Sequence, residues 1–307
     1  MSSRDTISNA PVITKILGKQ SPQGYWEEPT SPYLPKYRSS YWQIIILGRL
    51  GVRKSEPRVE RACENIFRFQ HEEGGFSCHI LKQPNSFLPY WREDREKSSS
   101  GEESFCSEML REQQFSCLTG NIVASMIRMG YRDDDRVRRA LQWLVNIQNK
   151  DGGWLCPYWR AHVNDKHRCF HGTICALETF SETPSEELSR GMKKAAKNGA
   201  EFLLTHRLFK ADHHAYRIIN PSWLKLRFPW FHEYSTLRGL DVLTKLGYVE
   251  DERLTDAVQA LMRKRREDGA WILERTPGKM HTTIETLGKP SKWITLIALR
   301  TLKRLSN

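Results

Sequence analysis

Several features that would place a chain in a specialised class are missing from this sequence. No apolar run is long enough to cross a bilayer, and residues 1–8 are polar where a secretory signal would be apolar. The seven cysteines are too few and too scattered for the disulfide framework of a small secreted domain. These absences predict a cytoplasmic protein without a membrane span, in which the cysteines are free thiols or metal ligands.

Strand-like alternation of apolar and polar residues is also missing over any useful length. The 307 residues are 39% hydrophobic and 27% charged, which is typical of a folded globular chain. A formal net charge of +12 favours an anionic partner: nucleic acid, a membrane surface or a phosphorylated small molecule. Nucleic acid is disfavoured, because lysines and arginines alternate with acids along the helices predicted below.

A short pattern recurs four times along the chain: a glutamine, three residues, a glycine, one residue and an aromatic residue. In the last copy Arg265 replaces the glutamine. Before the copies, apolar residues recur at intervals of three and four, which predicts one buried stripe on an α-helix. The copies occupy residues 20–26, 70–76, 148–154 and 265–271.

A second apolar segment follows each copy, so each unit is expected to be a helix, a turn, a second helix and a tight return. Gly130 followed by the acidic run 133–135 fits the end of one helix and the positive start of the next. The pattern predicts an all-α protein. The predicted second helices span about 41–50, 117–129, 169–180, 234–246 and 291–305.

We expect residues 1–307 to form a single domain with one long insertion at about 79–115. This insertion contains the polar run 97–103 and is expected to be a loop or lid over one end of the molecule.

Residues 148–154, Gln-Asn-Lys-Asp-Gly-Gly-Trp, resemble the QW repeat of squalene and terpenoid cyclases, which protein prenyltransferase β subunits carry in looser form. The resemblance extends from Val12 to about Leu305, and 288–295 is similar to the last inner helix of small stand-alone members. It implies an α/α toroid: a ring of about five to six helix hairpins, with inner and outer helices around a central cavity. An isoprenoid diphosphate is the ligand that this resemblance implies.

Acidic motifs of these families are missing. The chain has neither the Asp-x-Asp-Asp acid that protonates an alkene nor the Asp-Asp-x-x-Asp magnesium motif. The acidic run 133–135 lies between Arg132 and Arg136 before a predicted outer helix, where capping explains it better. The Asp-x-Cys pair of the prenyltransferase zinc site is missing as well. The resemblance therefore supplies an architecture more firmly than a reaction, and the catalytic residues stay unknown.

Four cysteines are expected at one end of the ring, because two follow the aromatic residues of neighbouring turns and two begin inner helices. Converging thiolates commonly hold a tetrahedral zinc ion, which predicts a zinc site at the mouth of the cavity. Four protein ligands would make it structural, whereas three would leave a position for chemistry. The predicted ligands are Cys117, Cys156 and Cys169, with Cys78, His167 or His171 as the fourth. Three other cysteines are interpreted as small buried residues: Cys63, Cys106 and Cys175.

The starts of the inner helices should make one end of the ring electropositive, because helix N-termini attract anions. Arg238 and Lys292 lie in the first turns of two predicted inner helices and are expected nearest to the diphosphate. Aromatic side chains would line the pocket for the hydrocarbon. The predicted substrate-binding residues are Arg238, Lys292, Tyr41, Trp42, Tyr234 and Trp293.

Three functions stay open. The leading hypothesis is a prenyltransferase-like or terpenoid-cyclase-like protein that binds an isoprenoid diphosphate and holds zinc at the cavity mouth. The second is a non-catalytic toroid that binds an isoprenoid or another lipid, and peripheral contact with a membrane also stays open. The third is a carbohydrate-active lyase or hydrolase, for which His232, Glu233 and Tyr234 are the candidate residues.

Overall fold

The structure is a computed structural model that describes residues 7, 9–77, 114–155, 169–213 and 215–306. These residues form ten α-helices and one two-stranded antiparallel sheet, in which β1 (Trp271–Ile272) pairs with β2 (Pro290–Ser291). The prediction of an all-α protein is confirmed. In the described part of the chain, no helix is long and apolar enough to cross a membrane.

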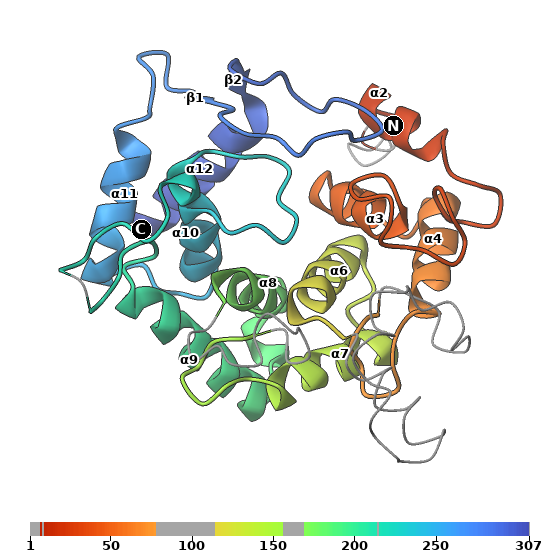
Figure 1. Ribbon diagram of the computed structural model, residues 1–307, viewed down its shortest axis with the longest axis horizontal. Coiled ribbons are helices and arrows are strands. Elements are labelled where there is room, and N and C mark those ends of the chain that lie inside the picture. Colours follow the sequence, from red (N-terminus) through yellow and green to blue (C-terminus); the bar gives the residue numbers. More distant parts are fainter. Residues whose placement is uncertain (1–6, 8, 78–113, 156–168, 214, 307) are drawn as a thin grey trace, which may run out of the picture.

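Outer and inner helices alternate along the chain and form five pairs in the described residues (Figure 1). Neighbouring inner helices pack side by side in chain order, and outer helices cover them. The outer helices are α2 (Pro11–Leu17), α4 (Pro57–Phe67), α7 (Asp135–Asn146), α9 (Arg190–Thr205) and α11 (Thr255–Met262). The inner helices are α3 (Ser40–Arg49), α6 (Ser116–Met129), α8 (Phe170–Ser181), α10 (Thr236–Lys245) and α12 (Lys292–Leu305). The inner helices begin and end within two residues of the predicted bounds.

The recurring turn has one structural role in each unit. The side-chain amide of Gln148 donates to the carbonyl of Gly152 (2.7 Å) and to that of Ala195 in the next outer helix (2.8 Å). The Trp154 indole N–H donates to the carbonyl of Leu144 (2.7 Å), in the helix before the turn. Equivalent bonds join Gln20 to Gly24 and Arg58, Gln70 to Gly74 and Arg136, and the indoles of Trp26 and Trp271 to Ile16 and Leu261.

The turn is also tied to the inner helix that follows it. The backbone N–H of Trp154 donates to Thr173 Oγ1 on α8 (3.0 Å), and that of Trp271 donates to Thr295 Oγ1 on α12 (3.1 Å). Each of the first three turns thus joins its own outer helix to the next outer helix and to an inner helix. α11 has no outer helix after it in the described chain, and there Arg265 lies over the Trp271 ring instead (5.5 Å).

The predicted helix boundaries follow local signals. Gly130 ends α6 in the left-handed conformation (φ 104°), which glycine adopts without steric cost. The Asp134 carboxylate caps α7 by accepting from the Arg136 backbone N–H (2.9 Å). The acidic run 133–135 therefore contributes the cap of α7, as predicted.

Loops join the first and last pairs of the ring. Residues 273–289 extend from β1 toward the N-terminal helix α2 (Figure 1). There His281 Nε2 lies 3.4 Å from Glu27 Oε1, and Glu27 is also paired with Arg38 (2.8 Å). Three 3-10 turns complete the described elements: Ser185–Glu187, Pro221–Leu224 and Glu252–Leu254. Most of the predicted insertion, 79–115, lies outside the described residues.

Candidate functional site

The middle of the ring is occupied by the segment that leads from α9 to α10. Its residues 226–235 pack against α3: Arg49 Nε donates to the Trp230 carbonyl (2.8 Å), and the Phe231 ring lies 5.0 Å from that of Trp42. Trp230 and Phe231 are fully buried. The side chains of this segment therefore take up part of the space inside the ring, where the sequence had suggested a central cavity.

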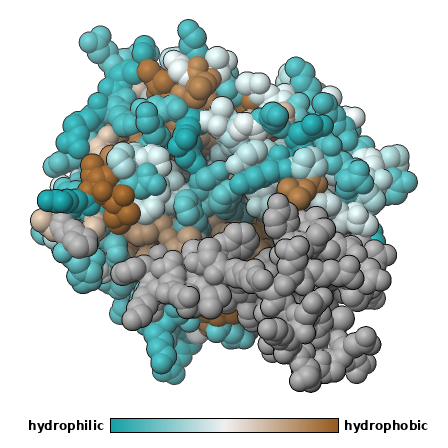
Figure 2. Space-filling model, viewed as in Figure 1, coloured by the Kyte–Doolittle hydropathy of each residue, from teal (hydrophilic) through white to brown (hydrophobic). Residues whose placement is uncertain are grey.

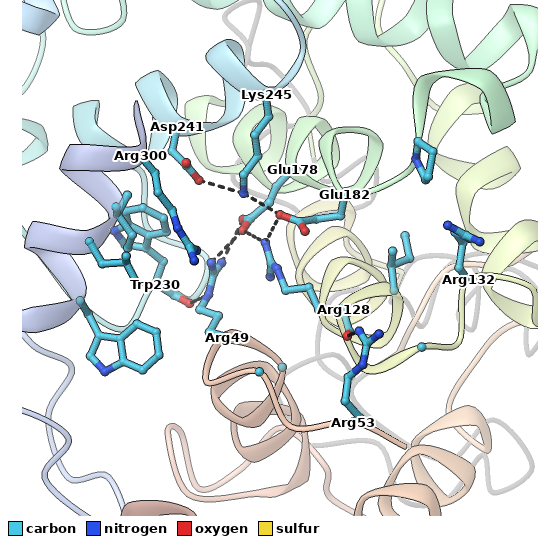
Figure 3. A pocket seen from close by; sticks show the side chains of 18 of the residues that line it. Arg49, Arg53, Arg128, Arg132, Glu178, Glu182, Trp230, Asp241, Lys245 and Arg300 are labelled. Atoms are coloured by element: carbon cyan, nitrogen blue, oxygen red, sulfur yellow. Dashed lines mark hydrogen bonds and ion pairs between the residues drawn. The ribbon is translucent and has the colours of Figure 1, made fainter. Parts of the chain in front are cut away.

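A buried ion-pair cluster lies beside this segment, centred on Glu178 of α8. Arg49 binds the Glu178 carboxylate with both terminal nitrogens (2.7 and 2.9 Å), and Arg238 donates through Nε (2.9 Å). Arg128 also pairs with Glu178, and with Glu182 at 2.9 Å. Three inner helices besides α8 thus contribute an arginine to one carboxylate. Figure 3 shows two of these arginines, Arg49 and Arg128, beside Glu178.

The charges within the cluster keep its carboxylate and its arginines ionised. Burial would raise the pKa of Glu178, but Arg238, Arg49 and Arg128 hold that pKa well below its usual range. Burial lowers the pKa of Arg49 to about 10, and the attraction of Glu178 opposes this change. Both groups are consequently charged at neutral pH.

A pocket of about 570 Å³ opens over this cluster. α3, α6, α8 and α10 all line it with residues near their C-terminal ends, α12 forms one wall, and Phe228 and Trp230 contribute from the central segment. The pocket therefore lies where the inner helices finish, whereas we expected the anion-binding mouth where they begin. Figure 3 shows the labelled side chains converging on it from several helices.

The pocket carries a surplus of positive charge. Its lining contains seven basic side chains and four carboxylates. Arg49, Arg128 and Lys245 lie in the last turns of their helices, where cations offset the negative end of the helix dipole. Lys245 is further paired with Glu182 (2.8 Å) and Asp241 (3.0 Å). These three cations and the two carboxylates that pair with Lys245 are thus held in ion pairs within the protein.

Two arginines of the pocket are not held in ion pairs in the part of the chain that the structure describes. Arg53 and Arg300 are exposed and have no carboxylate partner within the described residues; Arg53 donates only to the Arg128 carbonyl. Figure 3 shows Arg300 extending from α12 toward the Glu178 cluster. Two further donors of lining residues, Arg128 Nη1 and Trp230 Nε1, are buried without a hydrogen-bond partner in the described chain. These exposed arginines and these two buried donors form a site that can bind an anion.

The predicted substrate-binding residues are spread over the molecule, and only Trp293 lines the pocket, where its ring stacks on Phe228 (5.0 Å). Arg238 is fully buried and binds Glu178, Asn121 (2.8 Å) and the Phe231 carbonyl (2.6 Å), so its donors are used within the protein. Lys292 is exposed at the start of α12. The remaining three are core residues: Tyr41, Trp42 and Tyr234.

The residues of the carbohydrate hypothesis lie in the central segment rather than in the pocket. Tyr234 is buried and donates its hydroxyl hydrogen to the Leu208 carbonyl (2.7 Å). Glu233 accepts from the Tyr37 hydroxyl (3.1 Å), and burial, opposed by Glu233, lowers the pKa of His232 to about 4. None of the three lines the pocket.

The structure tests the predicted zinc site only in part. Cys117 is the second residue of α6, and Cys169 is the residue before α8. His171 Nδ1 accepts from the Tyr234 backbone N–H (2.8 Å). Cys78, Cys156 and His167 lie outside the described residues, as does Cys106. In the described residues no group of three or more candidate ligands could hold a metal, so the zinc site stays a prediction. Cys63 and Cys175 lie in the core, and burial raises the pKa of Cys175 to about 12.

The residues that form the pocket were missed in the sequence, although a signal for them is present. A basic residue closes four of the inner helices: Arg49, Arg128, Lys245 and Arg304. Because the inner helices run parallel around the ring, these positions meet at one end. The basic residue repeated in the last turns of these helices therefore predicts a basic pocket at that end of the ring.

No family of known proteins matches the chain, and no curated protein matches it. Among solved structures, a protein from Actinoplanes is similar at 16% identity over 98% of this chain and 87% of that one, with a TM-score of 0.46. The type II terpene cyclase MstE from Scytonema, bound to merosterolic acid A, is similar at 11% identity over 98% and 96%, with a TM-score of 0.41. Another MstE complex, with geranylgeranyl dihydroxybenzoate, reaches 12% identity over 98% and 97%, with a TM-score of 0.41. At such values, function must be argued from the pocket itself.

Proposed function

We propose that this chain binds an isoprenoid diphosphate in the basic pocket. The diphosphate lies among the arginines, and the hydrocarbon lies along α12. The observation that carries the proposal is the surplus of cations, of which Arg53 and Arg300 have no carboxylate partner in the described chain. A multiply charged anion with many acceptor oxygens suits such a set of guanidinium groups, which bind phosphates in bidentate fashion.

An apolar wall beside these arginines supports a ligand with a hydrocarbon part. Leu296 and Ile297 of α12 line the pocket together with the stacked rings of Trp293 and Phe228. A volume of about 570 Å³ lies in the range of roughly 300 to 1,000 Å³ that is usual for small-molecule sites. A sugar would instead need many free hydrogen-bonding groups, whereas Glu178, Glu182 and Asp241 of the lining are already paired with basic side chains.

The carboxylates of the pocket favour binding over acid-initiated cyclisation. Glu178, Glu182 and Asp241 are all paired with basic side chains. Burial would raise the pKa of Glu182, but Arg128 and Lys245 lower it. A carboxylate that stays ionised is a poor proton donor to an alkene. The proposal therefore concerns ligand binding, and it does not depend on the predicted zinc site, which belongs to the end where α6 and α8 begin.

Calorimetric titration tests the proposal with farnesyl diphosphate, farnesol and inorganic diphosphate. We expect farnesyl diphosphate to bind more tightly than either fragment, because only it occupies both parts of the pocket. Arg53→Gln and Arg300→Gln should each weaken its binding by roughly tenfold, since a hydrogen bond to a charged group contributes about 1.5 kcal/mol or more. Trp293→Ala should weaken farnesyl diphosphate but not inorganic diphosphate.

Arg190→Gln is the matched control, because Arg190 is an exposed arginine at the start of α9 and does not line the pocket. Its affinity should equal that of the parent chain. Lys292→Ala tests whether the ligand binds instead at the end of the ring where the inner helices begin. A loss of binding in this variant with none in Arg53→Gln and Arg300→Gln would move the ligand to the helix starts, and no binding of farnesyl diphosphate would contradict the proposal.

A further inference from the structure

A projecting hairpin between α9 and α10 displays apolar side chains to solvent. Its two sides are joined by hydrogen bonds from the Ala211 N–H to the Arg217 carbonyl (2.8 Å) and from the Ile219 N–H to the Phe209 carbonyl (2.9 Å). Lys210 and Ile218 form a bridge between them. These backbone contacts pair residues 209–211 with residues 217–219 and define the hairpin; residue 214, between the two sides, lies outside the described residues.

Three of four consecutive residues in this hairpin are large, apolar and exposed: Tyr216 (42%), Ile218 (47%) and Ile219 (40%). Single exposed apolar residues are common on proteins, but a contiguous group marks an interaction surface. The hydropathy surface in Figure 2 is mainly hydrophilic, with a few separate apolar patches.

Basic side chains lie beside this apolar group. Arg207 lies over the Tyr216 ring (4.3 Å), and Arg207 and Lys210 share the single carboxylate of Asp256 (3.2 and 2.7 Å). Arg217 belongs to the hairpin and Lys225 follows it, and neither has a carboxylate partner in the part of the chain that the structure describes. The side of the hairpin formed by residues 216–219 is therefore apolar, and basic side chains lie beside it.

We propose that this hairpin docks on an anionic lipid bilayer. Tyr216, Ile218 and Ile219 enter the interface between head groups and acyl chains, and Arg217 and Lys225 lie among the anionic head groups. Aromatic and aliphatic side chains combined with cations are the features that bind an anionic interface, where both apolar burial and charge contribute. The net charge of +12 attracts the whole chain to the same surface.

This inference does not rest on the proposed ligand. The hairpin connects the end of α9 to the start of α10, so it belongs to the end of the ring where the inner helices begin. The basic pocket lies where they finish. Membrane contact and ligand binding can therefore be measured separately.

Co-sedimentation tests the docking with vesicles of phosphatidylcholine, with or without phosphatidylglycerol. We expect the chain to bind the anionic vesicles at low salt and to be released as salt is raised. The double substitution Ile218→Ser, Ile219→Ser should weaken binding by roughly tenfold or more, because each isoleucine loses the free energy of its burial in the interface. Arg217→Gln should weaken it by about fivefold and reduce the salt dependence.

Leu299→Ser is the matched control, since Leu299 is 45% exposed on α12, far along the chain from the hairpin. It should bind vesicles like the parent, and all variants should keep the parent's helical circular dichroism and its affinity for farnesyl diphosphate. Equal vesicle binding by the hairpin variants, or none by the parent, would overturn the proposal. So would light scattering that shows a dimer abolished by the same substitutions, because the patch would then be covered by a second copy of the chain.

Discussion

Glu178 concentrates more interactions than its position in the sequence suggests. The residue is 1% exposed and pairs with three arginines, from α3, α6 and α10. Removing its charge would leave three guanidinium groups in low-dielectric surroundings with too little compensation. Glu178→Gln keeps the shape of the side chain, so its effect reports the charge rather than a cavity.

We expect Glu178→Gln to lower the free energy of unfolding by about 3 to 5 kcal/mol, the usual cost of breaking a buried ion pair. Urea denaturation at neutral pH measures it. The pH dependence provides the control. Because the folded-state pKa of Glu178 is lowered, its contribution is complete above the unfolded value of 4.5 and is lost as pH falls through the folded pKa. As pH falls below 4.5, the free energy of unfolding of the parent should decrease more steeply than that of the variant. Equal pH dependences of the two proteins would contradict this account.

At the scale of the element, the recurring glycine lets each of the first three turns approach the next outer helix. A Cβ on Gly152 would meet the Asn198 carbonyl oxygen at 2.3 Å, and Gly152 also has a positive φ of 92°. Gly247 has the same φ of 92°, but nothing lies within 4 Å of the position of its Cβ. The two glycines therefore separate backbone strain from close packing.

We expect Gly247→Ala to destabilise the fold by about 1 kcal/mol, the strain of a left-handed alanine. Gly152→Ala should cost about 1 to 3 kcal/mol more, because the turn and α9 must move apart. Thermal or urea unfolding of the two variants beside the parent measures the difference. Equal losses would show that the turn glycine serves only its own backbone conformation.

At the scale of the whole molecule, the two ends of the ring have different chemistry. Arginines gather where the inner helices finish, and the candidate thiols Cys117 and Cys169 lie where α6 and α8 begin. The predicted zinc site belongs to the latter end and is a property of the whole chain, because its other proposed ligands, Cys78 and Cys156, come from separate segments.

We expect about one zinc ion per chain when the protein is purified without added metal and measured by elemental analysis. Cys169→Ser should lower the zinc content, whereas Cys63→Ala should keep it, because Cys63 is a core residue whose Sγ lies 3.8 Å from Met129 Sδ. A fully folded parent chain without zinc would refute the site, because removal of a structural zinc usually unfolds much of a domain.

Much of the fold could be predicted from the sequence, because its signals are local. Apolar residues at intervals of three and four define one face of a helix, as Val137, Ala140 and Leu144 do in α7, all three of which are buried. Glycine and aspartate mark the ends of the helices by conformations and hydrogen bonds within a few residues. The helical pairs and their approximate bounds follow from such short-range rules.

Only the tertiary structure decided which end holds the pocket and which arginines reach it. Arg238 was expected at the mouth from its place in the first turn of α10, but Glu178, 60 residues earlier, lies opposite it and holds it in the interior. Arg49 meets the same carboxylate across 129 residues. A charge lowers its free energy by pairing when it is buried, and the partner is set by how distant helices pack, which no local pattern encodes. The segment 226–235 then packs among the inner helices, and the pocket lies where those helices finish.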